Sequence, residues 1–129
     1  MPPHTAPTEA ELSILRVLWE RGPSTVREVH EALYRGTEIG YTTSLKLLQN
    51  MLGKGLVTRD DEPRQHVYRA AVSKQRTLNA LVRAWIDKAF AGSSAALAIQ
   101  ALDAKPARRE ELARLKELIR KIEQRESKS

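Results

Sequence analysis

The 129-residue chain is 41% hydrophobic, which is enough for a globular core, and its length favours one compact domain with at most a small appendage. It contains no cysteine, which excludes disulfides, thiolate metal sites and cysteine nucleophiles and is typical of a reducing compartment. No apolar run of about eighteen residues and no leader-like segment occurs, so we expect a soluble, cytoplasmic protein that does not insert into a membrane.

The net charge of +6 is unevenly distributed along the chain. Residues 8–72 hold nine Lys/Arg and nine Asp/Glu, which cancel, whereas residues 73–129 hold thirteen and seven, which gives the whole excess of six. The overall charge is therefore weak support for nucleic-acid binding by the first part of the chain. The placement of the charges is more informative, because no Asp or Glu occurs in residues 39–59.

Two capping boxes predict the first two helices. Residues 1–7 include three prolines and are interpreted as a flexible arm. Thr8 and Glu11 then have the spacing of a capping box, which predicts a helix that ends at residues 22–23, Gly-Pro. A second capping box at residues 25–28 predicts a shorter helix directly afterwards.

A third helix is predicted over residues 41–54, with Thr42 as its N-cap and Gly55 as the left-handed residue after its end. The stripe that faces the core consists of Ser44, Leu47, Leu48 and Met51. The opposite side carries hydroxyl, ammonium and amide groups but no carboxylate, which suits phosphates and base edges. We interpret it as the recognition helix of a helix-turn-helix. The alternative is an ordinary amphipathic helix with a solvated polar face.

Two short runs of alternating character, residues 56–59 and 66–69, flank a turn-rich loop and predict a β-hairpin. Three helices followed by a hairpin make a winged helix, so residues 8–72 are the predicted DNA-binding domain. The predicted fold class is mainly α with a small β-hairpin wing. A helical dimerisation region at residues 73–126 and a frayed tail at 127–129 complete the chain.

The predicted helices in residues 73–126 carry strong apolar stripes and have too little chain around them to cover those stripes. A twofold partner would cover them, so we predict a homodimer. The alternative is a monomer in which these helices fold back onto the winged helix. The predicted dimer contacts are Leu78, Val82, Trp85, Ile86, Phe90, Leu112, Leu115, Ile119 and Ile122.

The predicted DNA contacts lie on the acid-free helix and at the tip of the wing. Lys46 is the first candidate, as a cation on the outward face, and Arg64 is placed to meet a phosphate. Thr42 and Thr43 either donate to phosphates from the helix start or only cap the helix. The whole predicted set is Thr42, Thr43, Leu45, Lys46, Gln49, Asn50 and Arg64.

Three of these candidates are assigned to bases rather than to phosphates. Gln49 and Asn50 are expected to reach base edges, although Gln49 borders the buried stripe. Leu45 either meets a thymine methyl group or packs partly into the core. Arg59 and Arg69 are further candidates for the DNA backbone.

No catalytic constellation or metal site is recognisable in the sequence. His4, His30 and His66 are scattered and lack the spacing of metal ligands. A glycine-rich phosphate loop and a nucleophile elbow are also absent from the sequence. We therefore expect no enzyme, no metal and no cofactor.

Several segments, in order along the chain, resemble one known family. They are TEAE at residues 8–11, STVREV at 24–29, YTT at 41–43, KGLV at 54–57 and VYRA at 67–70. Together they resemble the BlaI/MecI-type penicillinase-repressor family of winged-helix transcriptional regulators. The resemblance is close over residues 8–74 and covers the helical remainder in outline.

The resemblance implies a homodimeric repressor that sits on a dyad-symmetric operator in double-stranded DNA. It also implies a trigger, in which a membrane sensor with a metalloprotease domain causes the repressor to be cut in its C-terminal region. The corresponding region here is residues 98–102, in which Gln100 and Ala101 are nearest to the cut position, and these residues differ from the Asn-Phe pair of that family.

A second class of function stays open, namely a protein-interaction module that uses the winged helix as a scaffold and does not read DNA. Its docking surface would be the basic residues 105–125, set against an acidic partner. The acid-free residues 39–59 distinguish the two functions, because an interaction module has no reason to keep carboxylates off that helix face.

Overall fold

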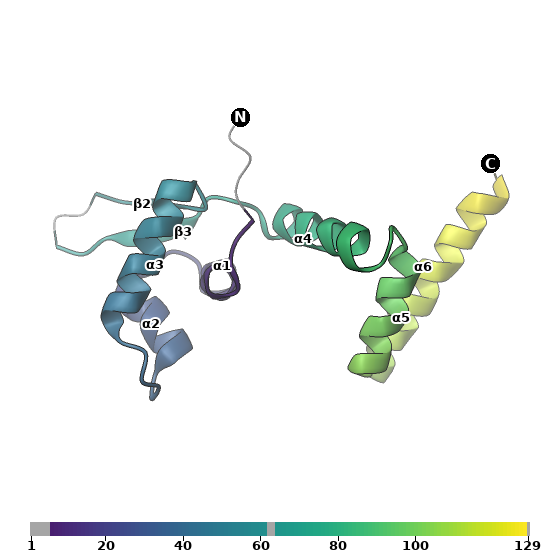
Figure 1. Ribbon diagram of the computed structural model, residues 1–129, viewed down its shortest axis with the longest axis horizontal. Helices are drawn as coiled ribbons and strands as arrows, with labels where there is room; N and C mark the ends of the chain where they lie inside the picture. The colour runs from purple at the N-terminus through teal and green to yellow at the C-terminus, as the bar shows by residue number, and fades with distance from the viewer. Residues whose placement is uncertain (1–5, 62–63, 129) are drawn as a thin grey trace. The chain divides into compact units, whose positions relative to one another are not determined.

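The computed structural model describes residues 6–61 and 64–128, and Figure 1 shows how they form helices and short strands. Most of the predicted arm, residues 1–5, lies outside the described residues. The elements are α1 (Glu9–Arg21), β1 (Ser24–Thr25), α2 (Val26–Tyr34), α3 (Tyr41–Lys54), β2 (Val57–Arg59), β3 (Val67–Ala70), α4 (Lys74–Ala89), α5 (Ser94–Ala104) and α6 (Arg109–Lys128). The chain divides into two compact units, residues 1–82 and residues 83–129, and the division falls within α4.

Both predicted capping boxes are present. The Thr8 N–H donates to Glu11 Oε1 (2.9 Å), and the Glu11 N–H donates to Thr8 Oγ1 (3.2 Å). In the second capping box the Thr25 N–H donates to Glu28 Oε1 (2.9 Å), and the Glu28 N–H donates to Thr25 Oγ1 (3.1 Å). Because a helix start leaves backbone N–H groups without partners, these side chains fix where α1 and α2 begin.

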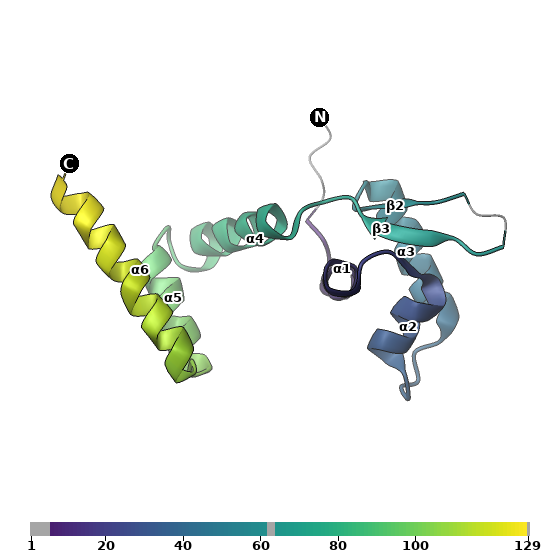
Figure 2. The ribbon, with the colours of Figure 1, turned by 180° about the vertical axis from the view of Figure 1, so that it is seen from behind.

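The core of the first unit lies between α1, α2, α3 and the sheet. Figure 2 shows these elements from behind. Trp19 on α1 borders this core, and its Nε1–H donates to the carbonyl oxygen of Val72, at 3.0 Å. This bond ties α1 to the segment that follows the sheet. The buried hydrophobic residues are Ile14, Leu15, Leu18, Val26, Val29, Leu48, Met51, Leu56, Val57 and Tyr68.

The predicted hairpin belongs to a three-stranded antiparallel sheet with the order β1-β3-β2. The register pairs Val57 with Ala70 and Arg59 with Tyr68. β2 and β3 lie within one residue of the runs predicted as strands, residues 56–59 and 66–69. The sequence missed β1, which pairs with the other edge of β3. Two residues are too few to show an alternating pattern, and these two also belong to the capping box that precedes α2.

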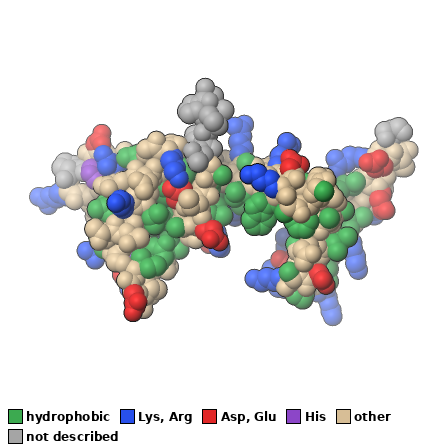
Figure 3. Space-filling model, in the orientation of Figure 1, with side chains coloured by type: hydrophobic (Ala, Val, Ile, Leu, Met, Phe, Trp, Pro, Cys, Tyr) green, Lys and Arg blue, Asp and Glu red, His purple; other side chains and the backbone are tan. Residues whose placement is uncertain are grey.

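The helices α4, α5 and α6 have no buried residue. Ser93 caps α5, because its Oγ accepts the Ala96 N–H (3.0 Å). α6 continues through Lys128, two residues into the predicted tail, and residue 129 lies outside the described residues. The predicted dimer contacts lie on α4, directly after α4 at Phe90, and on α6. All of them are exposed or half-buried in the single chain, and Trp85 is 63% exposed. Figure 3 shows hydrophobic side chains at the surface of this unit, between Lys and Arg side chains.

Candidate nucleic-acid interface

α3 has one buried face and one exposed face. Ser44, Leu48 and Met51 are buried, as the predicted stripe requires, and Leu47 is half-buried. The opposite side carries no carboxylate and is open to solvent. It brings together five predicted DNA contacts, namely Thr42, Thr43, Lys46, Gln49 and Asn50, all of which are exposed.

The start of α3 differs from the prediction. Gly40, not Thr42, is the N-cap, and the Thr43 N–H donates to the Gly40 carbonyl at 3.1 Å. No side chain caps this helix, so the alternative in which Thr42 or Thr43 serves only as a cap is wrong. The end of α3 agrees with the prediction, because Gly55 has φ 80° and ψ 13°, a left-handed conformation that glycine adopts without a steric penalty.

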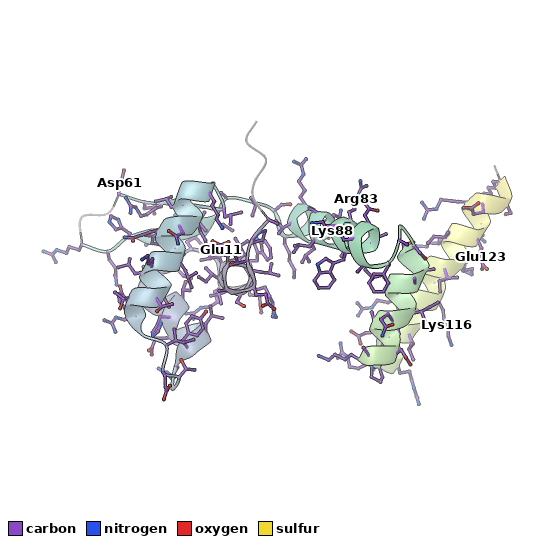
Figure 4. All side chains as sticks on the ribbon, in the orientation of Figure 1. Glu11, Asp61, Arg83, Lys88, Lys116 and Glu123 are labelled. Atoms are coloured by element: carbon purple, nitrogen blue, oxygen red, sulfur yellow. The ribbon has the colours of Figure 1, made fainter. Side chains whose placement is uncertain are left out.

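The other candidate contacts lie in the core or on the wing. Leu45 is half-buried and packs against the core, which favours its packing role over contact with a thymine methyl group. Arg64 is exposed in the wing loop, next to two residues that the structure does not describe. Arg69 pairs with Asp60 at 3.4 Å, and Asp61 extends from the same loop (Figure 4). The wing is therefore less suited to phosphates than α3 is.

An ion pair anchors the end of α3 to the start of α1. Lys54 Nζ lies 2.9 Å from both carboxylate oxygens of Glu11, which Figure 4 labels on α1. The Glu11 side chain is 3% exposed and that of Lys54 is 30% exposed. Burial alone would raise the pKa of Glu11, but the hydrogen bonds from Lys54 and from the Thr8 N–H, with the charge of Lys54, hold this pKa below its ordinary value.

A cluster between α2 and the first turn of α3 was missed from the sequence. His30 Nδ1 lies 2.7 Å from the Oγ of buried Ser44, and the His30 ring centroid is 6.1 Å from that of Tyr41. The Arg27 Cζ lies over the Tyr41 ring, 5.7 Å from its centroid. Arg27, His30 and Tyr34 follow i, i+3, i+7 spacing on α2, which is the signal that indicates a shared face.

Residues 6–61 and 64–128 contain no group of three or more His, Cys, Asp or Glu side chains placed to hold a metal ion. In the same ranges, no helix has both the length and the apolar character needed to cross a membrane.

The element order, the three-stranded sheet and the exposed face of α3 define a winged-helix protein. The crystal structure of the transcriptional regulator Tm0710 from Thermotoga maritima has this fold, with a TM-score of 0.51 and 19% identity. The similarity covers 95% of this chain and 80% of that one. It confirms the predicted fold class.

The chain belongs to the penicillinase repressor family, whose family model matches residues 7–121. This membership confirms the family that the sequence segments resemble. Because the family is one of repressors and not of enzymes, it also confirms the prediction that the protein is not an enzyme.

Some of the proteins to which this chain is similar carry the name BlaI. The transcriptional regulator BlaI of Mycobacterium tuberculosis is 39% identical over 61 residues, which are 46% of this chain and 44% of the relative. The matched segment thus spans less than half of the relative's length. The solution structure of Bacillus licheniformis BlaI, a monomeric form in complex with the blaP half-operator, has 23% identity and a TM-score of 0.48. The similarity to this structure covers 58% of this chain and 92% of the Bacillus licheniformis chain.

Proposed function

We propose that this protein is a DNA-binding transcriptional repressor, which acts as a homodimer on a dyad-symmetric operator in double-stranded DNA. The observation that carries the proposal is the exposed, carboxylate-free face of α3. We propose that it acts in the cytoplasm, the compartment predicted from the sequence. The family description and the name of the curated relative support the same regulatory role.

The exposed face of α3 has the chemistry that duplex DNA requires. Lys46 supplies a cation in the middle of the helix, while Thr42 and Thr43 supply hydroxyl donors in its first turn. Gln49 and Asn50 supply amide groups, which pair with the edges of bases in the major groove. Phosphate contacts would fix the position of the protein, and base contacts would set the sequence that it prefers.

Replacing Lys46 with alanine is expected to weaken binding to the operator by about ten- to hundredfold, because a charge-assisted hydrogen bond contributes about 1.5–3 kcal/mol. The fold should persist, since Lys46 is exposed. The operator would first be obtained by selecting bound duplexes from a random library with the wild-type protein. Binding would then be measured by fluorescence anisotropy, and folding by circular dichroism.

The matched control is Lys116→Ala, which removes the same group from α6, where Figure 4 labels it. This variant should bind the selected duplex as the wild type does. Equal affinities of the Lys46 and Lys116 variants would reject α3 as the reading helix. If no duplex is enriched while the protein still forms a dimer, the protein-interaction module would replace the proposed function.

The proposed dimer rests on the exposed apolar side chains of the second unit. Trp85 on α4 and Ile119 on α6 are 63% and 54% exposed, and Leu112 and Ile122 lie on the same stripe of α6. Large exposed apolar stripes mark association surfaces. A second copy of the chain is the proposed cover, because a dimer with twofold symmetry also presents two α3 helices to two operator half-sites.

Replacing Ile119 with glutamate is expected to weaken the dimer by about a hundredfold or more, since it would bury a carboxylate without a partner in each protomer. The dissociation constant would be measured by sedimentation equilibrium. Gln124→Glu introduces the same charge on the polar side of α6 and should leave the dimer unchanged. Identical association of both variants would contradict the proposed dimer surface.

We also propose, on the resemblance alone, that cleavage between Gln100 and Ala101 releases the repressor at the signal of a membrane sensor protease. Both residues are exposed, but they lie inside α5. Proteases bind an extended segment, so α5 would have to unfold locally before the cut. The intact mass of the protein, measured in cells before and after the regulated genes are induced, decides this part of the proposal.

A further inference from the structure

We propose that Arg27 is an additional contact to the DNA backbone and that Tyr41 is the residue that positions it. This inference rests on the proposed function, because it names a further part of the same surface. Neither residue is among the DNA contacts predicted from the sequence. The ligand is a phosphate group of duplex DNA, next to the phosphates that α3 approaches.

The guanidinium of Arg27 is held by an aromatic ring and not by a carboxylate. Its Cζ lies 5.7 Å from the centroid of Tyr41. Glu31, the acidic residue at i+4 from Arg27 on α2, forms an ion pair with Arg35, whose Nη2 lies 2.8 Å from Glu31 Oε1. Within residues 6–61 and 64–128, no carboxylate lies within 4.0 Å of Arg27.

Tyr41 is itself held in place from the buried side. Its ring makes an edge contact with the His30 ring, with 6.1 Å between centroids and an interplanar angle of 70°. His30 in turn lies 2.7 Å from the Oγ of Ser44, which is fully buried on the inner face of α3. The contacts from Ser44 through His30 and Tyr41 thus connect the core to the guanidinium of Arg27.

An arginine whose guanidinium lies over an aromatic ring is well suited to a phosphate. The contact with the Tyr41 ring does not use the N–H donors of the guanidinium. These donors match two phosphate oxygens. Tyr41 is 44% exposed and is the first residue of α3, directly before Thr42 and Thr43. Arg27 therefore lies at the same end of α3 as the proposed phosphate contacts, beside a stretch without carboxylates. This favours a phosphate over an acidic protein as the ligand.

The test replaces Arg27 with glutamine and measures binding at several salt concentrations, with the selected duplex and with a duplex of random sequence. We expect about a tenfold loss of affinity on both duplexes, because a phosphate contact carries no sequence information. The slope of log affinity against log salt should become shallower by about 0.9 per bound protomer. Arg16→Gln, an equal charge change at an exposed position of α1, should alter neither quantity.

The positioning role of Tyr41 is tested by a double-mutant cycle. Tyr41→Phe keeps the ring and should bind as the wild type does, whereas Tyr41→Ala should weaken binding only while Arg27 is present. In the Arg27→Gln background, Tyr41→Ala should therefore have little further effect. Tyr41→Ala effects of equal size in both backgrounds would reject the positioning role.

The inference and the proposed function fail in different ways. If Lys46→Ala weakens binding but Arg27→Gln matches Arg16→Gln in affinity and salt slope, only the inference about Arg27 is overturned. If the library yields no enriched duplex and the wild-type protein does not bind the duplex of random sequence, the proposed function fails and the inference fails with it. Loss of affinity for the selected duplex alone would assign Arg27 to a base, which also contradicts the inference.

Discussion

Replacing Lys54 with methionine is expected to lower the free energy of unfolding by about 2–3 kcal/mol at neutral pH. The substitution keeps the aliphatic stem but leaves the carboxylate of Glu11, whose side chain is 3% exposed, without its cation. Breaking a fully buried pair in this way costs about 3–5 kcal/mol. The smaller value applies here because Lys54 is 30% exposed. Urea unfolding followed by circular dichroism measures the change.

The effect of this substitution should depend on pH. In the wild type the pKa of Glu11 lies below its ordinary value of 4.5, so the pair stabilises the fold above about pH 4.5 and this stabilisation is lost as the pH falls through the lowered pKa. In Lys54→Met burial still raises the pKa, while the opposing contribution of Lys54 is gone. The ionised carboxylate is then costly until it is protonated. The stability difference should therefore be largest near neutral pH and shrink in acid.

The matched control for this prediction is the exposed ion pair of Arg35 and Glu31, which has a distance of 2.8 Å. Arg35→Met should change the free energy of unfolding by less than about 0.5 kcal/mol, because exposed pairs contribute little. If the Lys54 and Arg35 variants lose equal stability, or if the Lys54 effect does not vary with pH, burial of the Glu11 carboxylate is not the reason that its ion pair with Lys54 contributes to the free energy of unfolding.

Replacing Leu48 with alanine is expected to lower the free energy of unfolding by about 3–4 kcal/mol. Leu48 is fully buried in the middle of α3, and a leucine-to-alanine change in a core loses both transfer free energy and packing around the cavity that remains. Such a loss is a large fraction of the stability of a small domain. DNA binding should fall with it, since α3 carries the proposed contacts. Urea unfolding gives the stability of the variant.

Gln49→Ala is the control for Leu48→Ala, because it truncates the next residue of the same helix on the exposed side. Its stability should lie within about 0.5 kcal/mol of the wild type, while its operator preference should change at one base pair. Equal destabilisation by the two substitutions would contradict the assignment of a buried and an exposed face to α3. It would also remove the basis for the predicted DNA contacts.

The sequence by itself determined the local elements of this protein. The capping boxes that begin α1 and α2, the left-handed glycine after α3 and the stripe formed by Ser44, Leu48 and Met51 all depend on residues within a few positions of one another. Their chemistry is therefore visible in the spacing alone. The absence of carboxylates from residues 39–59 is visible in the same way, and together with the stripe it predicted an exposed face of α3 that carries no carboxylate.

Only the tertiary structure decided the contacts between residues that are far apart in the chain. Lys54 reaches Glu11 across 43 positions, β1 pairs with β3, and Arg27 meets Tyr41 at the corner of α2 and α3. The N-cap lies at Gly40, whose backbone is extended with φ −83° and ψ 160°, and not at Thr42. These features follow from how the elements pack, and packing brings together side chains whose separation in sequence carries no signal. Periodicity could therefore identify the faces of each helix, but not the residues that meet between them.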